Sequence, residues 1–106
     1  MSKELLLVVD AVASEKGVPE SVILEAIEAA LATAAKKRYM DQDVLTRVAI
    51  DSKDGSYETF RRWEVVADDV VMESPDRQLR LMDAIEEAEG VEVGDYIEEQ
   101  IENVDF

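Results

Sequence analysis

Apolar residues in the first part of the chain recur at the spacing of α-helices. In residues 3–16 they lie three or four positions apart, in the series Leu5, Val8, Val9 and Val12. This period places them on one helix face, and Gly17 is typical of the position just past a helix C-terminus. Ser2 is a candidate N-cap. Leu6 and Leu7 widen the apolar stripe, so we expect this helix to be covered on two sides.

A second helical pattern, over residues 18–39, is the strongest in the chain. Its apolar positions are Val22, Ile23, Ala26, Ile27, Ala30, Leu31 and Ala34. Pro19 suits the first helical position, because proline lacks the amide hydrogen that would stay unpaired there. Lys36, Lys37 and Arg38 fall in the predicted last turn, where positive side chains interact favourably with the helix dipole. The sequence therefore predicts two consecutive N-terminal helices.

Near Tyr39 the period changes from helical to alternating, which is typical of β-strands. Residues 43–51 and 57–66 form two such segments. Asp54-Gly55 lies between them and is a strong hairpin signal. We expect a β-hairpin over residues 43–66.

A two-residue turn in this hairpin would place Arg47 directly opposite Arg62, which is unfavourable unless another group offsets the two charges. The same register puts Arg61 and Trp63 on the mostly apolar face and Arg47 and Arg62 on the other face. We expect the core to include Ile27, Leu31, Val48, Ile50 and Trp63, with Val9 and Val12 under the first helix.

The pattern is weaker in the C-terminal part of the chain. Residues 70–73 (VVME) are a candidate short strand. Residues 74–88 allow two interpretations: a strand at 77–81 that continues as a helix, or one helix opened by Ser74 and Pro75. In either case Gly90 ends the segment.

The last segment, residues 91–104, is interpreted as a strand. Gly94-Asp95 makes a turn before it, although the four-residue spacing of Ile97 and Ile101 also fits a helix. The predicted fold class is α+β, with two N-terminal helices, a β-hairpin, and a mixed helix and strand C-terminal half. A chain of 106 residues fits a single domain.

Charge is distributed unevenly along the chain, whose formal net charge is -15. Residues 36–62 carry seven basic and five acidic side chains, a net charge of +2, whereas residues 63–106 carry two basic and fifteen acidic ones, a net charge of -13. Broad nucleic-acid binding requires clustered Lys and Arg and is therefore disfavoured. The apolar run LLLVV is too short for a signal peptide or a membrane span, so we expect a soluble, cytoplasmic protein.

Catalytic and metal-binding signals are weak. Cysteine and histidine are absent, which removes thiol chemistry, the usual general base and the commonest metal ligand. Asp51, Asp54, Gly55 and Glu58 resemble a calcium loop only superficially, because aligning Gly55 to its glycine puts Ile50 and Arg61 at ligand positions. The sequence predicts no enzyme, no metal and no cofactor. Basic residues gathered on an acidic body indicate a docking surface instead.

Four segments, in this order, resemble the NusA N-terminal domain family of bacterial transcription elongation and termination factors. They are KELLLVVDAVASEKGVP, ILEAIEAALATAAKKRY, FRRWEVV and VGDYIEEQI. ALATAAKKRY followed about twenty residues later by TFRRWEVV is the most specific combination. The segments span nearly the whole chain, which ends at NVDF where family members continue into a long helix. The resemblance thus implies a single N-terminal domain, truncated just before that connecting helix.

The resemblance implies a domain that binds RNA polymerase and modulates pausing, termination and antitermination. It implies docking near the RNA exit channel on the flap of the β subunit, with the C-terminal domain of the α subunit nearby. Nascent RNA would be contacted only locally and weakly, and we expect a monomer. An acidic protein–protein interaction domain outside transcription is the alternative.

The residues proposed to face RNA or polymerase form one basic patch. They are Lys36, Lys37, Arg38, Arg47 and Arg62. Arg61, next to Trp63 on the apolar face, is expected to be structural.

Overall fold

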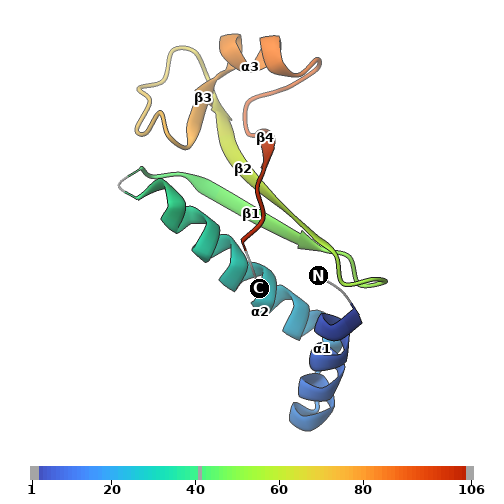
Figure 1. The fold of residues 1–106 in the computed structure, drawn as a ribbon. Coiled ribbons are helices and arrows are strands. Elements are labelled where there is room, and N and C mark those ends of the chain that lie inside the picture. Colours follow the sequence, from blue (N-terminus) through green and yellow to red (C-terminus); the bar gives the residue numbers. More distant parts are fainter. Residues whose placement is uncertain (1–2, 41, 105–106) are drawn as a thin grey trace.

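The computed structural model describes residues 3–40 and 42–104 and confirms the α+β class. The elements follow one another as α1 (Lys3–Lys16), α2 (Glu20–Lys36), the 3₁₀-helix η1 (Lys37–Tyr39), β1 (Leu45–Ile50), β2 (Tyr57–Val66), β3 (Gln78–Arg80), α3 (Leu81–Glu87) and β4 (Tyr96–Ile101). The molecule is elongated, measuring 51 × 30 × 23 Å along its principal axes. The α1–α2 pair lies at one end and α3 at the other (Figure 1).

Both N-terminal helices form where the helical period predicts them. α1 ends at Lys16 and is followed by Gly17, whose φ of 65° is a conformation that favours glycine. Pro19 is the N-cap of α2 and not its first helical residue, so that prediction was wrong by one position. The candidate cap Ser2 lies outside the described residues.

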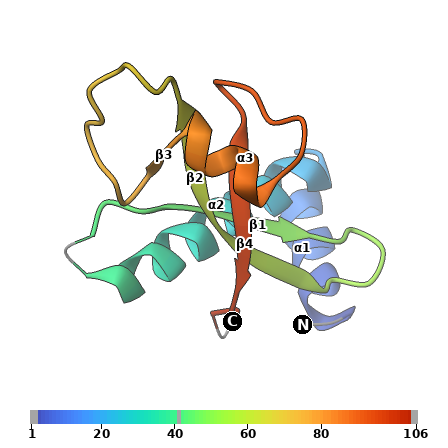
Figure 2. The same cartoon turned by 90° about the horizontal axis from the view of Figure 1, so that it is seen from above.

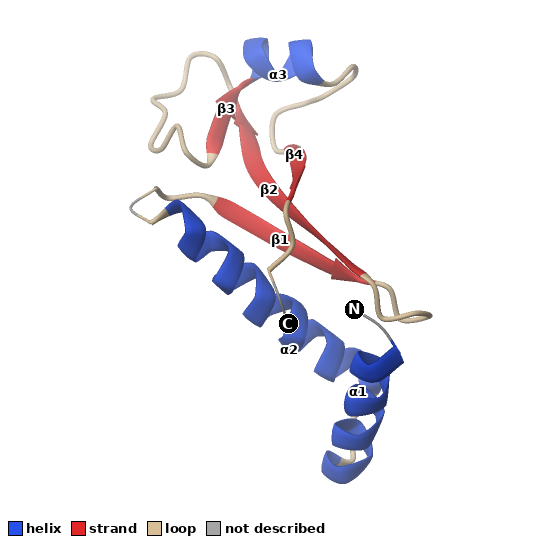
Figure 3. Cartoon of the chain, in the orientation of Figure 1, coloured by secondary structure: helices blue, strands red, loops and turns tan. Residues whose placement is uncertain are grey.

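α1 is covered on one side only. Its buried residues are Leu5, Val9 and Ala13. Leu7 and Val8 are 69% and 54% exposed, so the expectation of cover on two sides was wrong for this chain. The reason is that α1 packs mainly against α2, beyond the end of the sheet (Figure 3).

Strand β2 is the centre of the four-stranded sheet. Its residues 59–62 pair with both β1 and β4, so these two strands lie on opposite edges, and both are antiparallel to β2. Glu64 pairs with both β3 and β4, so β3 follows β1 along the same edge, in parallel orientation. In Figure 2, β4 (red) crosses β2 near the centre of the view.

The hairpin forms, but its register differs from the prediction by two residues. Arg47 lies opposite Phe60, and Arg62 lies opposite Leu45. The connection is longer than two residues because Asp51 and Ser56 close it, with the Asp51 N–H donating to the Ser56 carbonyl at 2.8 Å. Side chains alternate between faces with a period of two, so a two-residue shift leaves every residue on its predicted face.

Helix α2 packs on one face of this hairpin and forms the main core with it. Leu31, Val48 and Tyr57 are buried together, with Ile27, Ala32, Ile50 and Val104 packed around them. Two polar contacts fix the helix to β1. The Thr46 hydroxyl donates to the Ala32 carbonyl at 2.6 Å, and the Ile50 N–H donates to the Glu28 carboxylate at 2.8 Å.

The C-terminal half resolves the alternatives left open by the sequence. A strand followed directly by a helix is confirmed by β3 and α3, and the interpretation of residues 91–104 as a strand is confirmed by β4. Residues 70–73 form no strand, so that prediction was wrong. The residues just before this segment contact α3 instead. The Asp68 carboxylate accepts a hydrogen bond from the Met82 N–H of α3 at 2.9 Å.

Candidate interaction surface

Arg47 and Arg62 meet at a single carboxylate on the sheet face opposite α2. Glu98 of β4 lies directly across from Arg62 in the ladder. Its two oxygens accept hydrogen bonds from Arg47 Nε at 2.7 Å and Nη2 at 2.9 Å, and Arg62 Nε lies 2.9 Å from Oε2. This carboxylate is the group that offsets the repulsion between the two arginines.

Electrostatics in the cluster favour the charged forms. The hydrogen bonds from Arg47 hold the pKa of Glu98 below its ordinary value, and Arg62 adds to the effect. The same contacts raise the pKa of Arg47. Three charges remain, two positive and one negative, so the cluster keeps a net positive charge on an acidic molecule.

Aromatic rings hold both guanidinium groups against the sheet. The Arg47 guanidinium lies 4.5 Å from the centre of the Phe60 ring, and that of Arg62 lies 3.9 Å from the centre of the Tyr96 ring. Cation–π contacts of this kind contribute about 0.5–1 kcal/mol at exposed sites. The two arginines are therefore positioned side chains and not freely moving surface charges.

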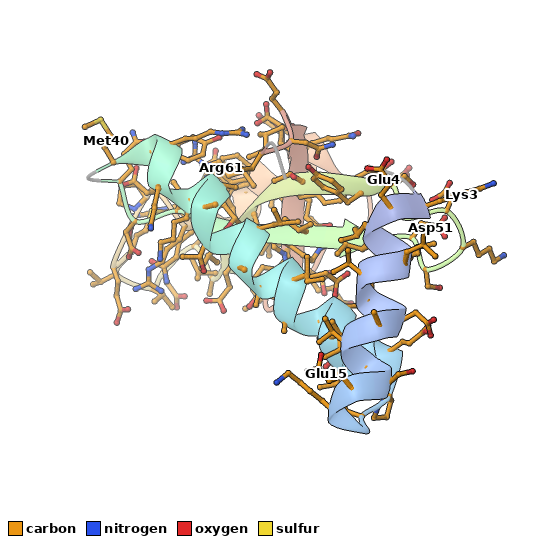
Figure 4. The ribbon with its side chains drawn as sticks, turned by 60° about the horizontal axis from the view of Figure 1, so that its bottom comes forward. Lys3, Glu4, Glu15, Met40, Asp51 and Arg61 are labelled. Carbon is orange, nitrogen blue, oxygen red and sulfur yellow. The ribbon has the colours of Figure 1, made fainter. Side chains whose placement is uncertain are left out.

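Arg61 is placed on the face that α2 covers, as predicted from the alternation. Its guanidinium lies 4.9 Å from the ring centre of Tyr39 and 4.5 Å from that of Trp63, and it donates to the Asp76 carbonyl at 3.2 Å. Figure 4 shows it close to the C-terminal half of α2. Arg61 therefore links η1, β2 and the loop before β3.

Trp63 itself is only partly buried, contrary to the prediction, because an open pocket lies beside it.

The other three predicted residues belong to a different element. Lys36 ends α2, and Lys37 and Arg38 lie in η1. Arg38 donates to the main-chain carbonyl of Glu102, just after β4. In the described part of the chain, neither Lys36 nor Lys37 forms an ion pair, and both are exposed. The five residues thus form two groups, one at the end of α2 and one on the sheet.

Glu98 and Tyr96 are the residues of this surface that the sequence did not reveal. Both lie on β4, more than thirty positions from Arg62, and the pairing of β4 with β2 depends on the tertiary fold. Alternation within the segment YIEEQI places Tyr96 and Glu98 on one face, but it does not say which strand that face lies beside.

Residues 3–40 and 42–104 contain no group of three or more acidic, histidine or cysteine side chains arranged to hold a metal ion. A helix long and apolar enough to cross a membrane is likewise absent from these residues. The geometry is that of a small α+β domain with a cluster of positive charge on one face of its sheet.

Comparison with known proteins identifies the family. The family model described as the NusA N-terminal domain matches residues 4–106. The transcription termination/antitermination protein NusA of Bacillus subtilis (strain 168) is 38% identical over 110 residues, covering 100% of this chain and 28% of the relative. The protein of the same name from Halalkalibacterium halodurans is 34% identical, covering 100% of this chain and 27% of the relative.

A solved structure gives the same result. The solution structure of the N-terminal domain of NusA from B. subtilis matches with a TM-score of 0.71 at 34% identity, covering 99% of this chain and 82% of that one. The chain belongs to the NusA N-terminal domain family. It spans less than a third of the curated relatives that it matches.

Proposed function

We propose that this chain is the RNA polymerase-binding domain of a bacterial transcription factor that modulates pausing, termination and antitermination. The observation that carries the proposal is the family match over residues 4–106. The relatives are named for termination and antitermination, which are events of the transcribing polymerase. The domain acts by binding and not by catalysis, as a monomer in the cytoplasm.

The docking site on polymerase is the flap of the β subunit, near the RNA exit channel, with the C-terminal domain of the α subunit within reach. Apolar surface supplies most of the affinity of such an interface, and charge supplies orientation and association rate. The domain has exposed apolar side chains for this purpose at both ends, including Leu7 and Val8 on α1 and Met82 and Ile85 on α3.

The basic residues face exiting RNA. Arg47 and Arg62 support this role because Phe60, Tyr96 and Glu98 hold them in place, so little side-chain freedom is lost on contact. Lys36 and Lys37 support it because they are exposed and unpaired within the described residues. Free RNA binds weakly because the net charge of -15 repels it. Once polymerase holds the domain, the effective RNA concentration is high and weak contacts contribute.

Titration of the isotope-labelled domain with a β-flap fragment tests the docking proposal by NMR. We expect shifts or broadening over one contiguous surface. A pull-down with core RNA polymerase checks the same contact in the assembled enzyme. Absence of shifts at high flap concentration, together with no retention on polymerase, would favour the alternative of an acidic interaction domain outside transcription.

A further inference from the structure

A pocket of about 410 Å³ opens beside Trp63, the only tryptophan in the chain. Its lining residues are Trp63, Leu79, Glu87, Ile97, Glu98 and Glu99. The sheet register explains the apolar part, since Trp63 pairs with Ile97 across β2 and β4, and Leu79 of β3 pairs with the next β2 residue on the same face, Val65. Neighbouring strands thus supply an aromatic and two aliphatic side chains to one hollow.

Two carboxylates, those of Glu87 and Glu99, border this apolar floor and have no cation. Glu98 also lines the pocket, but its carboxylate lies on the opposite face of the sheet, where it pairs with Arg47 and Arg62. The carboxylates of Glu87 and Glu99 form no ion pair or hydrogen bond within the described residues, and both side chains are exposed. The surrounding segment strengthens the imbalance, because residues 63–106 carry a net charge of -13. The pocket therefore combines apolar walls with unneutralised negative charge.

The chain itself shows that Trp63 accommodates a guanidinium group. The Arg61 guanidinium lies over the indole at 4.5 Å from the ring centre. Arginine and lysine bury their aliphatic stems against apolar surface while the charged end reaches a polar partner. The side chains of Leu79 and Ile97 can pack against such an aliphatic stem, and the carboxylates of Glu87 and Glu99 can pair with its charged end. RNA and other polyanions do not fit, since their phosphates would meet carboxylates.

We propose that this pocket binds a basic, apolar peptide segment of a protein partner, in which an arginine or lysine adjoins leucine-like side chains. Its volume lies within the range of about 300–1,000 Å³ typical of binding pockets. The pocket is distinct from the basic residues proposed to face RNA. The proposal does not depend on polymerase being the partner, so failure to bind a β flap would leave it intact.

A synthetic peptide provides the probe. We would use an amphipathic peptide of leucine and arginine about 12 residues long, roughly three helical turns, and a control peptide of equal charge with serine in place of leucine. Emission from Trp63 reports occupancy directly, because the chain has no other tryptophan. We expect a saturable change in emission with the leucine peptide and binding weaker by about tenfold or more with the serine peptide.

Matched charge variants separate the pocket from general attraction to an acidic protein. Glu87→Lys with Glu99→Lys should weaken binding of a fluorescently labelled leucine peptide by about tenfold or more. Glu15→Lys with Glu25→Lys changes the net charge equally, on exposed positions of α1 and α2, and should leave the affinity within about twofold. Far-UV circular dichroism would verify that both double variants keep the fold.

Two results would overturn the proposal. If both double variants weaken binding of the leucine peptide equally, the peptide is attracted by the overall negative charge and no specific site exists here. If free arginine amide, at the same concentration as the peptide, produces the same change in Trp63 emission, the pocket binds small cations and not a protein segment.

Discussion

At the residue scale, the decisive side chain is Glu98. Two arginines near each other on a sheet repel, and a lone carboxylate in contact with both converts the repulsion into an attractive three-charge cluster. Partial exposure of these side chains keeps the net contribution of the cluster modest, since surface ion pairs contribute about 0–1 kcal/mol to stability. Its larger effect is to hold the arginines in fixed positions.

Replacement of Glu98 should make this contribution measurable through its dependence on pH. The native pKa of Glu98 lies below its ordinary value of 4.5, so its stabilisation is complete above that value and is lost as pH falls through the native pKa. Glu98→Gln should therefore lower the free energy of unfolding by about 0.5–1 kcal/mol at roughly pH 7. The difference from wild type should shrink as the pH falls below 4.5 and the Glu98 carboxylate takes up a proton.

Urea denaturation at several pH values measures this difference. Glu99→Gln is the matched control, because its carboxylate is adjacent in β4 but forms no ion pair within the described residues. A difference for Glu98→Gln that persists unchanged at low pH would show that the carboxylate charge is not what stabilises the native state.

At the element scale, the two N-terminal helices differ in how they are held. α2 lies along the hairpin and buries Leu31 in the core, whereas α1 packs mainly against α2. Leu31 of α2 is therefore buried, whereas Leu7 lies on the uncovered side of α1. Leu31 is 6% exposed and Leu7 is 69% exposed.

Truncation of these two leucines should have contrasting effects. Leu31→Ala removes packing around Val48 and Tyr57 and should lower the free energy of unfolding by about 2–5 kcal/mol. Leu7→Ala should change it by no more than about 0.5 kcal/mol. Chemical denaturation of both variants is the measurement. A large loss for Leu7→Ala would mean that α1 is covered on a second side in solution.

At the scale of the whole molecule, positive charge is confined to a few places on an acidic body. Lys36 and Lys37 lie at the end of α2, and Arg47 and Arg62 lie on the sheet face opposite this helix. Reversing the charge of Arg62 would place a carboxylate beside Glu98 and disturb the sheet. The exposed lysines allow a cleaner test of the RNA-facing role.

Lys36→Glu with Lys37→Glu, in the full-length factor, should leave the fold and polymerase binding intact and reduce pausing at RNA hairpins. The physical reason is the loss of two cations near emerging RNA. The defect should shrink as salt rises, because screening already weakens the wild-type contacts. A paused transcription assay at two salt concentrations measures this effect.

Lys3→Glu with Lys16→Glu is the matched control, since it makes the same charge change at exposed positions of α1. If the Lys36 and Lys37 variant pauses like the wild type at low salt, these lysines do not contact RNA and only cap the end of the helix. An equal defect in the control would indicate general repulsion.

Hydrophobic periodicity by itself determined the two helices, the hairpin strands and the face on which each hairpin side chain lies. These features survive because period 3.6 and period 2 are local properties of the chain, and a register shift of two residues does not exchange the faces of a strand. The segments quoted above were likewise sufficient to identify the family.

The tertiary structure alone decided the pairing of β4 with β2, and with it the partner of Arg47 and Arg62. It also decided that Trp63 borders an open pocket and that one side of α1 stays uncovered. Each of these depends on contacts between segments far apart in the sequence. A local pattern predicts on which face of its own helix or strand a side chain lies, but it does not predict which distant residue the side chain contacts.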